Sequence, residues 1–270
     1  MTKDVMIERN EPYCEERAEG SAAASSREPG AVWLKTRVRN YWAKRAEDFQ
    51  AQRLRELRSP LRDRWYAEMM KYLPMGRELR ILDLGTGTGF FAFLLSEKGN
   101  FVTGIDLTEE MIRGANELAG ILGMPADFRV MDAETPEFEP ESFDALVTRN
   151  LTWTLPHLEK AYRNWYRLLT PGGVLINFDG DYGHAGPQEN WKDNLSHRNV
   201  TEEMKLESDS ITAEVAKSQG IRPLWDTRLL MDAGFERISL DTGAYRRIYR
   251  EKDEFYNPIP IFVIAAYKPY

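Results

Sequence analysis

Residues 80–91, with the sequence RILDLGTGTGFF, decide the fold of this chain. A short apolar run that contains Asp83 meets three alternating glycines, Gly85, Gly87 and Gly89, and an apolar segment compatible with a helix follows. This pattern predicts a strand, a tight loop and a helix. Glycine lets a ligand approach the main chain, and a helix N-terminus directs free N–H groups at it. We therefore expect a ligand-binding loop here rather than a purely structural turn.

The glycine spacing separates this loop from two other nucleotide-binding loops. A dinucleotide fingerprint would need its third glycine at position 90, which is Phe90. A P-loop would carry Lys followed by Ser or Thr after the glycines, and this chain does not. The pattern D-x-G-x-G-x-G at residues 83–89 instead resembles motif I of the class I S-adenosylmethionine (SAM)-dependent methyltransferases. The resemblance covers about residues 79–178, with weaker support towards the C-terminus.

Two further acids follow predicted strands. The strand at residues 101–106 ends in Asp106, at a spacing from the glycines that suits a carboxylate accepting hydrogen bonds from ribose hydroxyls. The resemblance implies the same contact with the ribose of SAM. After the strand at residues 127–131, it implies that Asp132 receives the adenine amino group while the N–H of Ala133 meets the ring. A helix cap at Asp106 and a simple turn at Asp132 are the structural alternatives.

The resemblance also reaches the N-terminal helix and the fourth strand. Residues 41–49 are similar to a helix that closes over SAM in small-molecule members, where Tyr41 would contact the cofactor and Trp42 would pack. Both aromatic residues are equally compatible with core anchors of an amphipathic helix. Asn150 follows a predicted strand, where the transferring methyl lies in many members. The implied cofactor-binding residues are Tyr41, Asp83, Gly85, Thr86, Gly87, Gly89, Asp106, Leu107, Met111, Asp132, Ala133 and Asn150.

Strand and helix patterns alternate along most of the chain, which predicts an α/β fold. With the resemblance, we expect a Rossmann-like, seven-stranded, mostly parallel sheet with helices on both faces and a closing antiparallel hairpin. N-terminal helices are predicted at residues 32–50 and 51–72, with a break at Pro60, and a Thr-Pro-Gly-Gly turn at residues 170–173. The strands are predicted at about residues 79–84, 101–106, 127–131, 142–150, 174–179, 235–240 and 259–267.

The domain organisation follows from changes in composition. Residues 1–30 are polar and rich in Ala and Ser, and we interpret them as a flexible tail. Residues 31–270 are expected to form a single methyltransferase domain with a helical cap at 31–75. Residues 180–221 are too long for an ordinary strand-to-helix link and are rich in aromatic side chains and turn formers, so we expect a lid over the substrate. A solvated ornament or an oligomer contact is the alternative. The later link with Tyr245, Tyr249, Phe255 and Tyr256 is also expected to reach the cleft.

Composition limits the choice of partners and compartment. Acidic residues outnumber basic ones by 43 to 36, so the net charge of −7 argues against a nucleic-acid enzyme. We interpret the arginine-rich residues 35–64 as the solvated face of amphipathic helices rather than an RNA-binding surface. Cys14 is the only cysteine and there is no long apolar run, which favours a cytoplasmic protein without a membrane segment. One Cys and three His residues form no Cys-rich metal site, so no metal is expected.

Methyl transfer from a sulfonium needs alignment of the nucleophile, the methyl carbon and the sulfur more than covalent help. A general base is useful for some acceptors. Histidine is the residue type best suited to remove a proton near neutral pH, so the candidates are His184 and its neighbours Asp181 and Tyr182.

The favoured hypothesis is a SAM-dependent methyltransferase that acts on an oxygen or nitrogen of a small molecule and releases S-adenosylhomocysteine (SAH). The chain has Asn150-Leu151-Thr152-Trp153 in place of the Asn/Asp-Pro-Pro-Tyr-like sequence of many enzymes that methylate base amines. The alternatives are a non-catalytic SAM-binding module and an RNA or protein methyltransferase. A monomer or a homodimer is expected.

Overall fold

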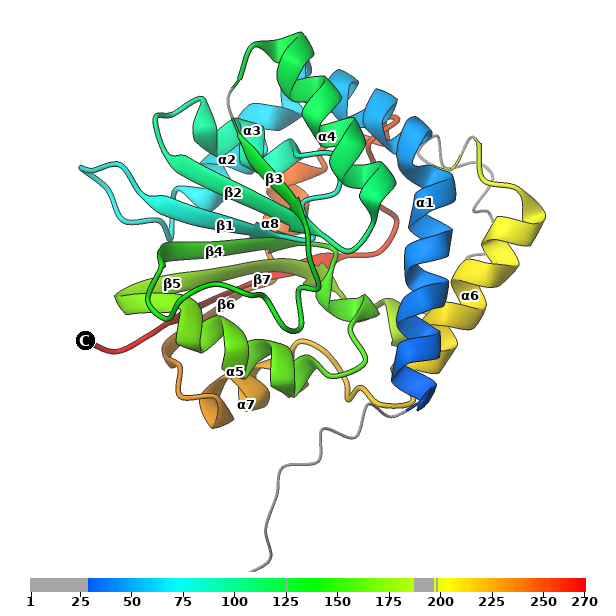
Figure 1. The fold of residues 1–270 in the computed structure, drawn as a ribbon. Coiled ribbons are helices and arrows are strands. Elements are labelled where there is room, and N and C mark those ends of the chain that lie inside the picture. Colours follow the sequence, from blue (N-terminus) through cyan, green and yellow to red (C-terminus); the bar gives the residue numbers. More distant parts are fainter. Residues whose placement is uncertain (1–28, 125, 187–196, 198) are drawn as a thin grey trace, which may run out of the picture.

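A seven-stranded sheet runs through the centre of the computed structural model, which describes residues 29–124, 126–186, 197 and 199–270 (Figure 1). The strand order is β3-β2-β1-β4-β5-β7-β6. The first five strands in this order are parallel, and β7 is antiparallel to both of its neighbours. The predicted sheet with its closing antiparallel hairpin is therefore confirmed. The strands are β1 (Arg80–Leu84), β2 (Phe101–Asp106), β3 (Asp127–Val130), β4 (Phe143–Arg149), β5 (Leu169–Gly180), β6 (Glu236–Asp241) and β7 (Ile261–Tyr267).

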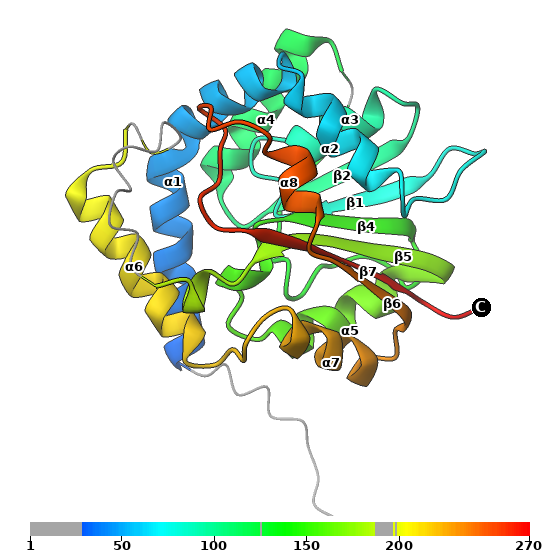
Figure 2. The ribbon, with the colours of Figure 1, turned by 180° about the vertical axis from the view of Figure 1, so that it is seen from behind.

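Helices cover both faces of the sheet, as predicted (Figures 1 and 2). One face carries α2, α3, α4 and α8, and the other carries α5 and α7. Two short 3-10 helices, η1 (Thr152–Thr154) and η2 (Tyr182–His184), follow β4 and β5. The α-helices are α1 (Pro29–Leu57), α2 (Leu61–Met69), α3 (Phe90–Ser96), α4 (Glu109–Leu122), α5 (Leu158–Leu168), α6 (Glu202–Ala216), α7 (Leu224–Asp232) and α8 (Ala244–Ile248).

The strand before the glycine loop serves both halves of the core. Ile81 belongs to the apolar cluster on one face, while Leu82 and Leu84 belong to the cluster on the other, and all three are 0% exposed. Successive side chains of a strand point to opposite faces, so a strand covered on both sides carries apolar side chains on both faces, and the buried Asp83 is the exception in β1. Full burial of each such side chain stabilises the fold by about 1.5–3 kcal/mol. The rigid sheet fixes the loop at its carboxyl end.

Helices α1 and α6 lie side by side beyond the carboxyl ends of the parallel strands (Figures 1 and 2). Leu34 and Tyr41 of α1 pack against Ile211 and Val215 of α6 in a small apolar cluster of their own. Ligands of open α/β sheets bind outside the carboxyl ends of the strands. The two helices therefore cover the place where a ligand is expected.

The structure corrects two predicted boundaries. Helix α1 continues through residues 50 and 51, because no glycine or proline interrupts residues 31–57, and the chain breaks only around Pro60. The predicted turn at residues 170–173 lies inside the long strand β5. Its residues loop out between the pairs Phe143↔Leu169 and Ala145↔Val174, so the turn interrupts the register without ending the strand.

Parts of the predicted tail and of the predicted lid lie outside the residues that the structure describes. The predicted tail lies outside the described residues, except that positions 29 and 30 begin α1. Cys14 and part of the predicted lid, residues 187–196 and 198, also lie outside them. Within the described part of the chain, no helix combines the length and the hydrophobicity needed to cross a lipid bilayer.

Candidate active site

The loop after β1 is held by the acid that precedes it. Asp83 Oδ2 accepts a 2.6 Å hydrogen bond from Thr86 Oγ1 and a 3.1 Å bond from the backbone N–H of Ala92, in the first turn of α3. Burial raises the pKa of Asp83 to about 7, although these two hydrogen bonds oppose the shift. The carboxyl group of Asp83 therefore joins β1, the glycine loop and α3 through hydrogen bonds, although its burial costs desolvation free energy.

The acid at the end of β2 braces the same loop from the other side. Asp106 Oδ2 accepts from the backbone N–H of Gly87 at 3.0 Å, and Oδ1 accepts from the N–H of Thr108 at 2.9 Å. Burial raises the pKa of Asp106, and its backbone hydrogen bonds oppose this. Hydrogen bonds from the Thr108 side chain and the Leu107 backbone also reach this carboxyl group, which lines the cavity described next.

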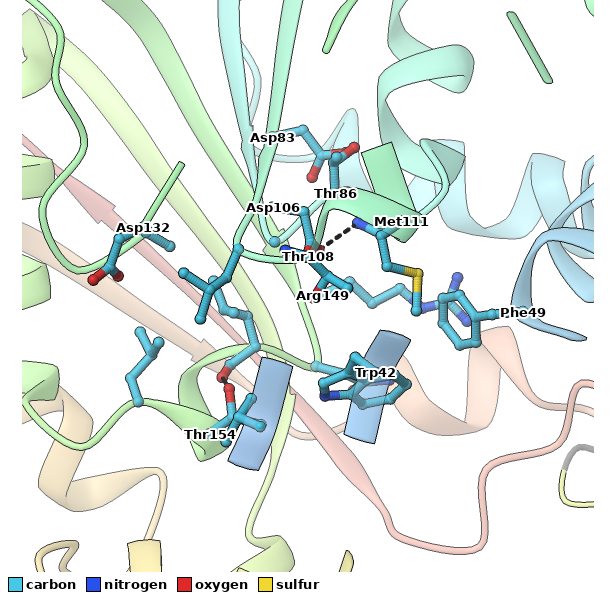
Figure 3. Close-up of a pocket in the computed structure, with 18 of the residues that line it drawn as sticks. Trp42, Phe49, Asp83, Thr86, Asp106, Thr108, Met111, Asp132, Arg149 and Thr154 are labelled. Atoms are coloured by element: carbon cyan, nitrogen blue, oxygen red, sulfur yellow. Dashed lines mark hydrogen bonds between the residues drawn. The ribbon is translucent and has the colours of Figure 1, made fainter. Parts of the chain in front are cut away.

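A first cavity, of about 170 Å³, opens beside the glycine loop (Figure 3). Leu151, Thr154, Leu155 and Pro156 complete its wall after β4. The cofactor-binding residues predicted from the sequence that line it are Asp83, Gly85, Thr86, Gly87, Asp106, Leu107, Met111, Asp132, Ala133 and Asn150. The structure thus brings ten of the twelve together.

The remaining two, Tyr41 and Gly89, do not line this cavity. Gly89 caps α3 with φ of +91°, and an added Cβ would lie 2.8 Å from Phe93 and Phe128, so its contacts are with the core. Tyr41 lines a second cavity, and its neighbour Trp42 lies at the wall of both.

One stripe of α1 forms the outer wall of the first cavity: Lys35, Val38, Trp42, Phe49 and Arg53. These positions recur at helical spacing, so they share one face of the helix. Figure 3 shows Trp42 and Phe49 on this wall, opposite the strand ends.

At one end of this stripe, Lys35 joins α1 to the loop after β3. Its Nζ lies 2.6 Å from Asp132 Oδ2 and 2.5 Å from Glu134 Oε2. Burial lowers the pKa of Lys35, but the hydrogen bonds and charges of the two acids outweigh it, so the net shift is upward. The helix is therefore held closed at the predicted adenine end.

A second cavity, of about 500 Å³, adjoins the first. Its wall combines α1, α6, η2 and residues 249–259. The expectation that Tyr249, Phe255 and Tyr256 reach the cleft is confirmed, whereas Tyr245 is absent from the wall. The residues that line both cavities are Trp42, Phe49, Arg53, Arg149 and Asn150.

Asn150 stands at this junction in an unusual conformation. Its φ is +54°, in the left-handed region that asparagine tolerates better than most residues. Its Oδ1 accepts from the Tyr182 hydroxyl at 3.0 Å, and its backbone oxygen accepts from Trp153 Nε1 at 3.0 Å. Asn257 Nδ2 in turn donates to the Tyr182 oxygen at 2.7 Å. The turn after β4 is therefore held by side chains of the second cavity.

The three candidate bases lie in different places. Tyr182 lines the second cavity, but burial raises its pKa far above the ordinary value, so it remains a neutral phenol. His184 Nδ1 lies 2.7 Å from Asp181 Oδ1, and neither residue is part of the wall of either cavity.

The charged residues at the cavity junction were not predicted from the sequence. The interpretation of residues 35–64 as a solvated face is wrong for Arg45, Arg53 and Glu56, which are 6%, 8% and 0% exposed. Because α1 crosses the ends of the strands, both sides of this helix are covered there. The helical spacing of Arg53 from Trp42 and Phe49 was the available signal.

Fold and site together define a class I SAM-dependent methyltransferase. A family model described as "Methyltransferase domain" matches residues 82–177. The chain is 31% identical over 143 residues to phosphatidylethanolamine N-methyltransferase of Cereibacter sphaeroides, covering 47% of this chain and 70% of that protein. The chain therefore belongs to the class I SAM-dependent methyltransferase family, whose methyl donor is SAM.

Two further comparisons concern longer proteins. The chain is 33% identical over 101 residues to phosphoethanolamine N-methyltransferase 1 of Arabidopsis thaliana, which covers 37% of this chain and 21% of that protein. The structure resembles phosphoethanolamine N-methyltransferase 2 of Haemonchus contortus, solved in complex with SAM, with a TM-score of 0.56 at 22% identity. That match covers 76% of this chain and 52% of the other, and it shows a shared fold.

The residues of the first cavity fit SAM. The carboxyl group of Asp106 lines this cavity beside the glycine loop, where the ribose contact is predicted. At Gly87 an added Cβ would meet only Phe49, at 3.2 Å, so the main chain of the loop is open towards the cavity. Asp132 lies at the far end of the same cavity and is 29% exposed, within reach of a ligand.

Proposed function

We propose that this methyltransferase transfers the methyl group of SAM to an oxygen or nitrogen of a small molecule, and that this acceptor lies in the second cavity. The observation that carries the proposal is the junction, where five residues line both cavities. Donor and acceptor can then meet without crossing solvent. The bound cofactor supplies an electrophilic methyl, and the chain supplies alignment, which is worth several kcal/mol through proximity.

The cofactor contacts in this proposal follow the walls of the first cavity. The carboxylate of Asp106 accepts hydrogen bonds from the ribose hydroxyls. Asp132 accepts a hydrogen bond from the adenine amino group, and the N–H of Ala133 contacts the adenine ring. Asn150 and Trp42 border the reacting end, because they face both cavities.

The acceptor contacts come from aromatic and amide side chains. Tyr182 and Trp153 stack with ring centroids 4.9 Å apart, and both line the second cavity. With its raised pKa, Tyr182 donates and accepts hydrogen bonds rather than removing a proton. We propose that residues 180–221 act as the lid, since η2 and α6 provide one side of this cavity.

The relatives favour a small acceptor. By their names, they methylate phosphoethanolamine or phosphatidylethanolamine. Both acceptors carry an amine nitrogen. A cavity of about 500 Å³ has the size of a small-molecule site rather than of a groove for a folded macromolecule.

The full chain, incubated with methyl-labelled SAM and fractionated metabolite extract, tests the proposal. We expect SAH to accumulate in at least one fraction, and the label to appear on a small molecule. SAM binding by calorimetry without turnover in any fraction would favour the non-catalytic module. Label on added RNA or protein instead would overturn the small-molecule assignment.

A variant separates the roles of the two cavities. Phe255 lines only the second cavity, so Phe255→Ala should raise the KM for the acceptor by about tenfold and leave SAH affinity within twofold. Phe138→Ala is the matched control, because Phe138 is also partly buried but packs against Phe143, outside the wall of both cavities. Equal loss of affinity for both ligands would contradict the assignment of the second cavity to the acceptor.

A further inference from the structure

Two arginines share one buried carboxylate at the junction of the cavities. Glu56 of α1 is 0% exposed, and its Oε1 lies 2.9 Å from Nη2 of Arg149, the last residue of β4. Its Oε2 pairs with Arg53, one turn earlier on α1. The cluster therefore joins α1 to the strand that leads into the junction.

The cluster carries more positive than negative charge. Arg53 and Arg149 bring two guanidinium groups against the single carboxylate of Glu56. Burial lowers the pKa of Arg53, and the charge of Arg149 lowers it further, as expected for crowded cations. The Nε and Nη1 atoms of Arg149 find no hydrogen-bond acceptor among the described residues. Buried N–H donors without an acceptor are costly, and an anion would supply the acceptors that Glu56 alone does not.

Asp83 is another carboxyl group whose charge interacts with that of Arg149. Burial raises the pKa of Asp83 to about 7, so near neutral pH it is only partly ionised. It therefore supplies no full second negative charge to the arginine pair.

Aromatic rings hold the guanidinium groups in place. Arg149 lies 4.1 Å from the ring centroid of Trp65 and 5.0 Å from that of Phe90, and Arg53 lies 4.3 Å from that of Phe49. Stacking on rings leaves the edge of a guanidinium group, with its N–H donors, free for planar or tetrahedral oxyanions. Figure 3 shows Arg149 in the wall of the first cavity, and both arginines line both cavities.

We propose that Arg53 and Arg149 form an oxyanion-binding site at the junction, which holds a carboxylate or phosphate group of a ligand of the active site. The inference rests on the proposed function. Two ligands can present this chemistry: the carboxylate of the methionine part of the cofactor, and an acidic group on the acceptor. In either case the anion neutralises the excess charge and fixes its carrier at the point where the cavities meet.

The test compares opposite changes of charge. Arg149→Gln removes one cation, and Glu56→Gln removes the shared carboxylate with little change of shape. Arg129→Gln is the control, because Arg129 is half exposed, pairs with Asp127 and is outside both cavity walls. Calorimetry measures the affinity of each protein for SAH and for 5′-methylthioadenosine, which lacks the amino-acid part. It then measures the affinity of the SAH-saturated protein for benzoate, inorganic phosphate and neutral benzyl alcohol.

Two results support the site and identify the source of the anion. If the cofactor carboxylate is bound, Arg149→Gln weakens SAH by tenfold or more and leaves 5′-methylthioadenosine within twofold. If the acceptor is bound, the wild type with SAH binds benzoate or phosphate but not benzyl alcohol. Arg149→Gln then loses that binding, and Glu56→Gln strengthens it several-fold.

Changes within twofold for every probe in both variants would overturn the inference and leave the proposed function intact. If Arg149→Gln fails to fold, Glu56→Gln still tests the inference, because it is expected to raise the affinity for the anion instead of lowering it. Failure of the wild type to bind SAH would contradict the proposed function. Phosphate titration of the ligand-free protein would then still decide whether the arginine pair binds anions.

Discussion

Gly87→Ala is expected to separate cofactor binding from folding. Gly87 has φ of +54°, and its N–H donates to Asp106. An added Cβ would lie 3.2 Å from Phe49 Cε1 and 3.7 Å from Cδ1, with no other atom within 4 Å. The substitution thus adds one methyl group between the loop and the wall of the first cavity.

The size of the effect follows from two contributions. The left-handed backbone costs an alanine about 1–2 kcal/mol. The short contact adds little to unfolding in the ligand-free protein, because the edge of Phe49 can yield towards the cavity. That movement fills space that the ligand needs, and overpacking of this kind costs about 1–3 kcal/mol. We therefore expect SAH affinity to fall by roughly 5- to 150-fold.

Calorimetry with SAH and thermal unfolding without ligand measure the two effects. Gly89→Ala is the matched control, because its Cβ would lie 2.8 Å from Phe93 and Phe128 in the core, away from the cavity. The control should lose more stability than Gly87→Ala, while its folded fraction keeps its SAH affinity. If Gly87→Ala binds SAH within twofold of the wild type, the assignment of the glycine loop to the cofactor is refuted.

Three further substitutions test the acids and the lysine around the first cavity. Asp106→Asn keeps the shape of the side chain but replaces one acceptor oxygen with a donor. The binding free energy of SAH, measured by calorimetry, should therefore weaken by about 1–3 kcal/mol. Unchanged affinity would contradict the ribose contact. Burial raises the pKa of Asp83 to about 7, against about 3.9 in an unfolded chain. The folded state then binds more protons between about pH 4 and 7, so this group makes stability fall as pH rises through that window, by up to about 4 kcal/mol. Asp83→Asn should lack this slope in urea unfolding at pH 5 and pH 7.5, and an identical slope would refute the shift. Lys35→Met leaves Glu134, 1% exposed, without its cation, so thermal unfolding should show a loss of about 1–3 kcal/mol. Lys35→Arg should recover part of that loss, and no loss in the methionine variant would contradict the tie at the adenine end.

The glycine loop and the acids at the strand ends were predictable because their roles are local. Asp83 lies near the end of β1 and Asp106 ends β2, and parallel strands present their carboxyl ends at one edge of the sheet. Asp132 follows β3, which pairs with β2, so it reaches the same edge. Spacing along the chain was therefore enough to bring the three acids together.

The rotation of α1 was not predictable in the same way. Tyr41 and Trp42 are adjacent in sequence, but successive residues of a helix are turned by about 100° from one another. Trp42 faces both cavities, whereas Tyr41 packs partly against α6. Only the packing of α1 on α6 and on the strand ends decides which of the two borders the cofactor.

The sequence by itself determined the fold class, the glycine loop and the class of cofactor, because each depends on residues close together in the chain. The tertiary structure alone decided the second cavity and the arginine pair at its entrance. Arg53 and Arg149 lie on a helix and a strand far apart in sequence, and both share Glu56. Charged residues at helical spacing look solvated until another part of the fold covers them. Here the end of β4 and the start of α3 cover them, since Glu56 pairs with Arg149 and Arg53 lies over the ring of Phe90.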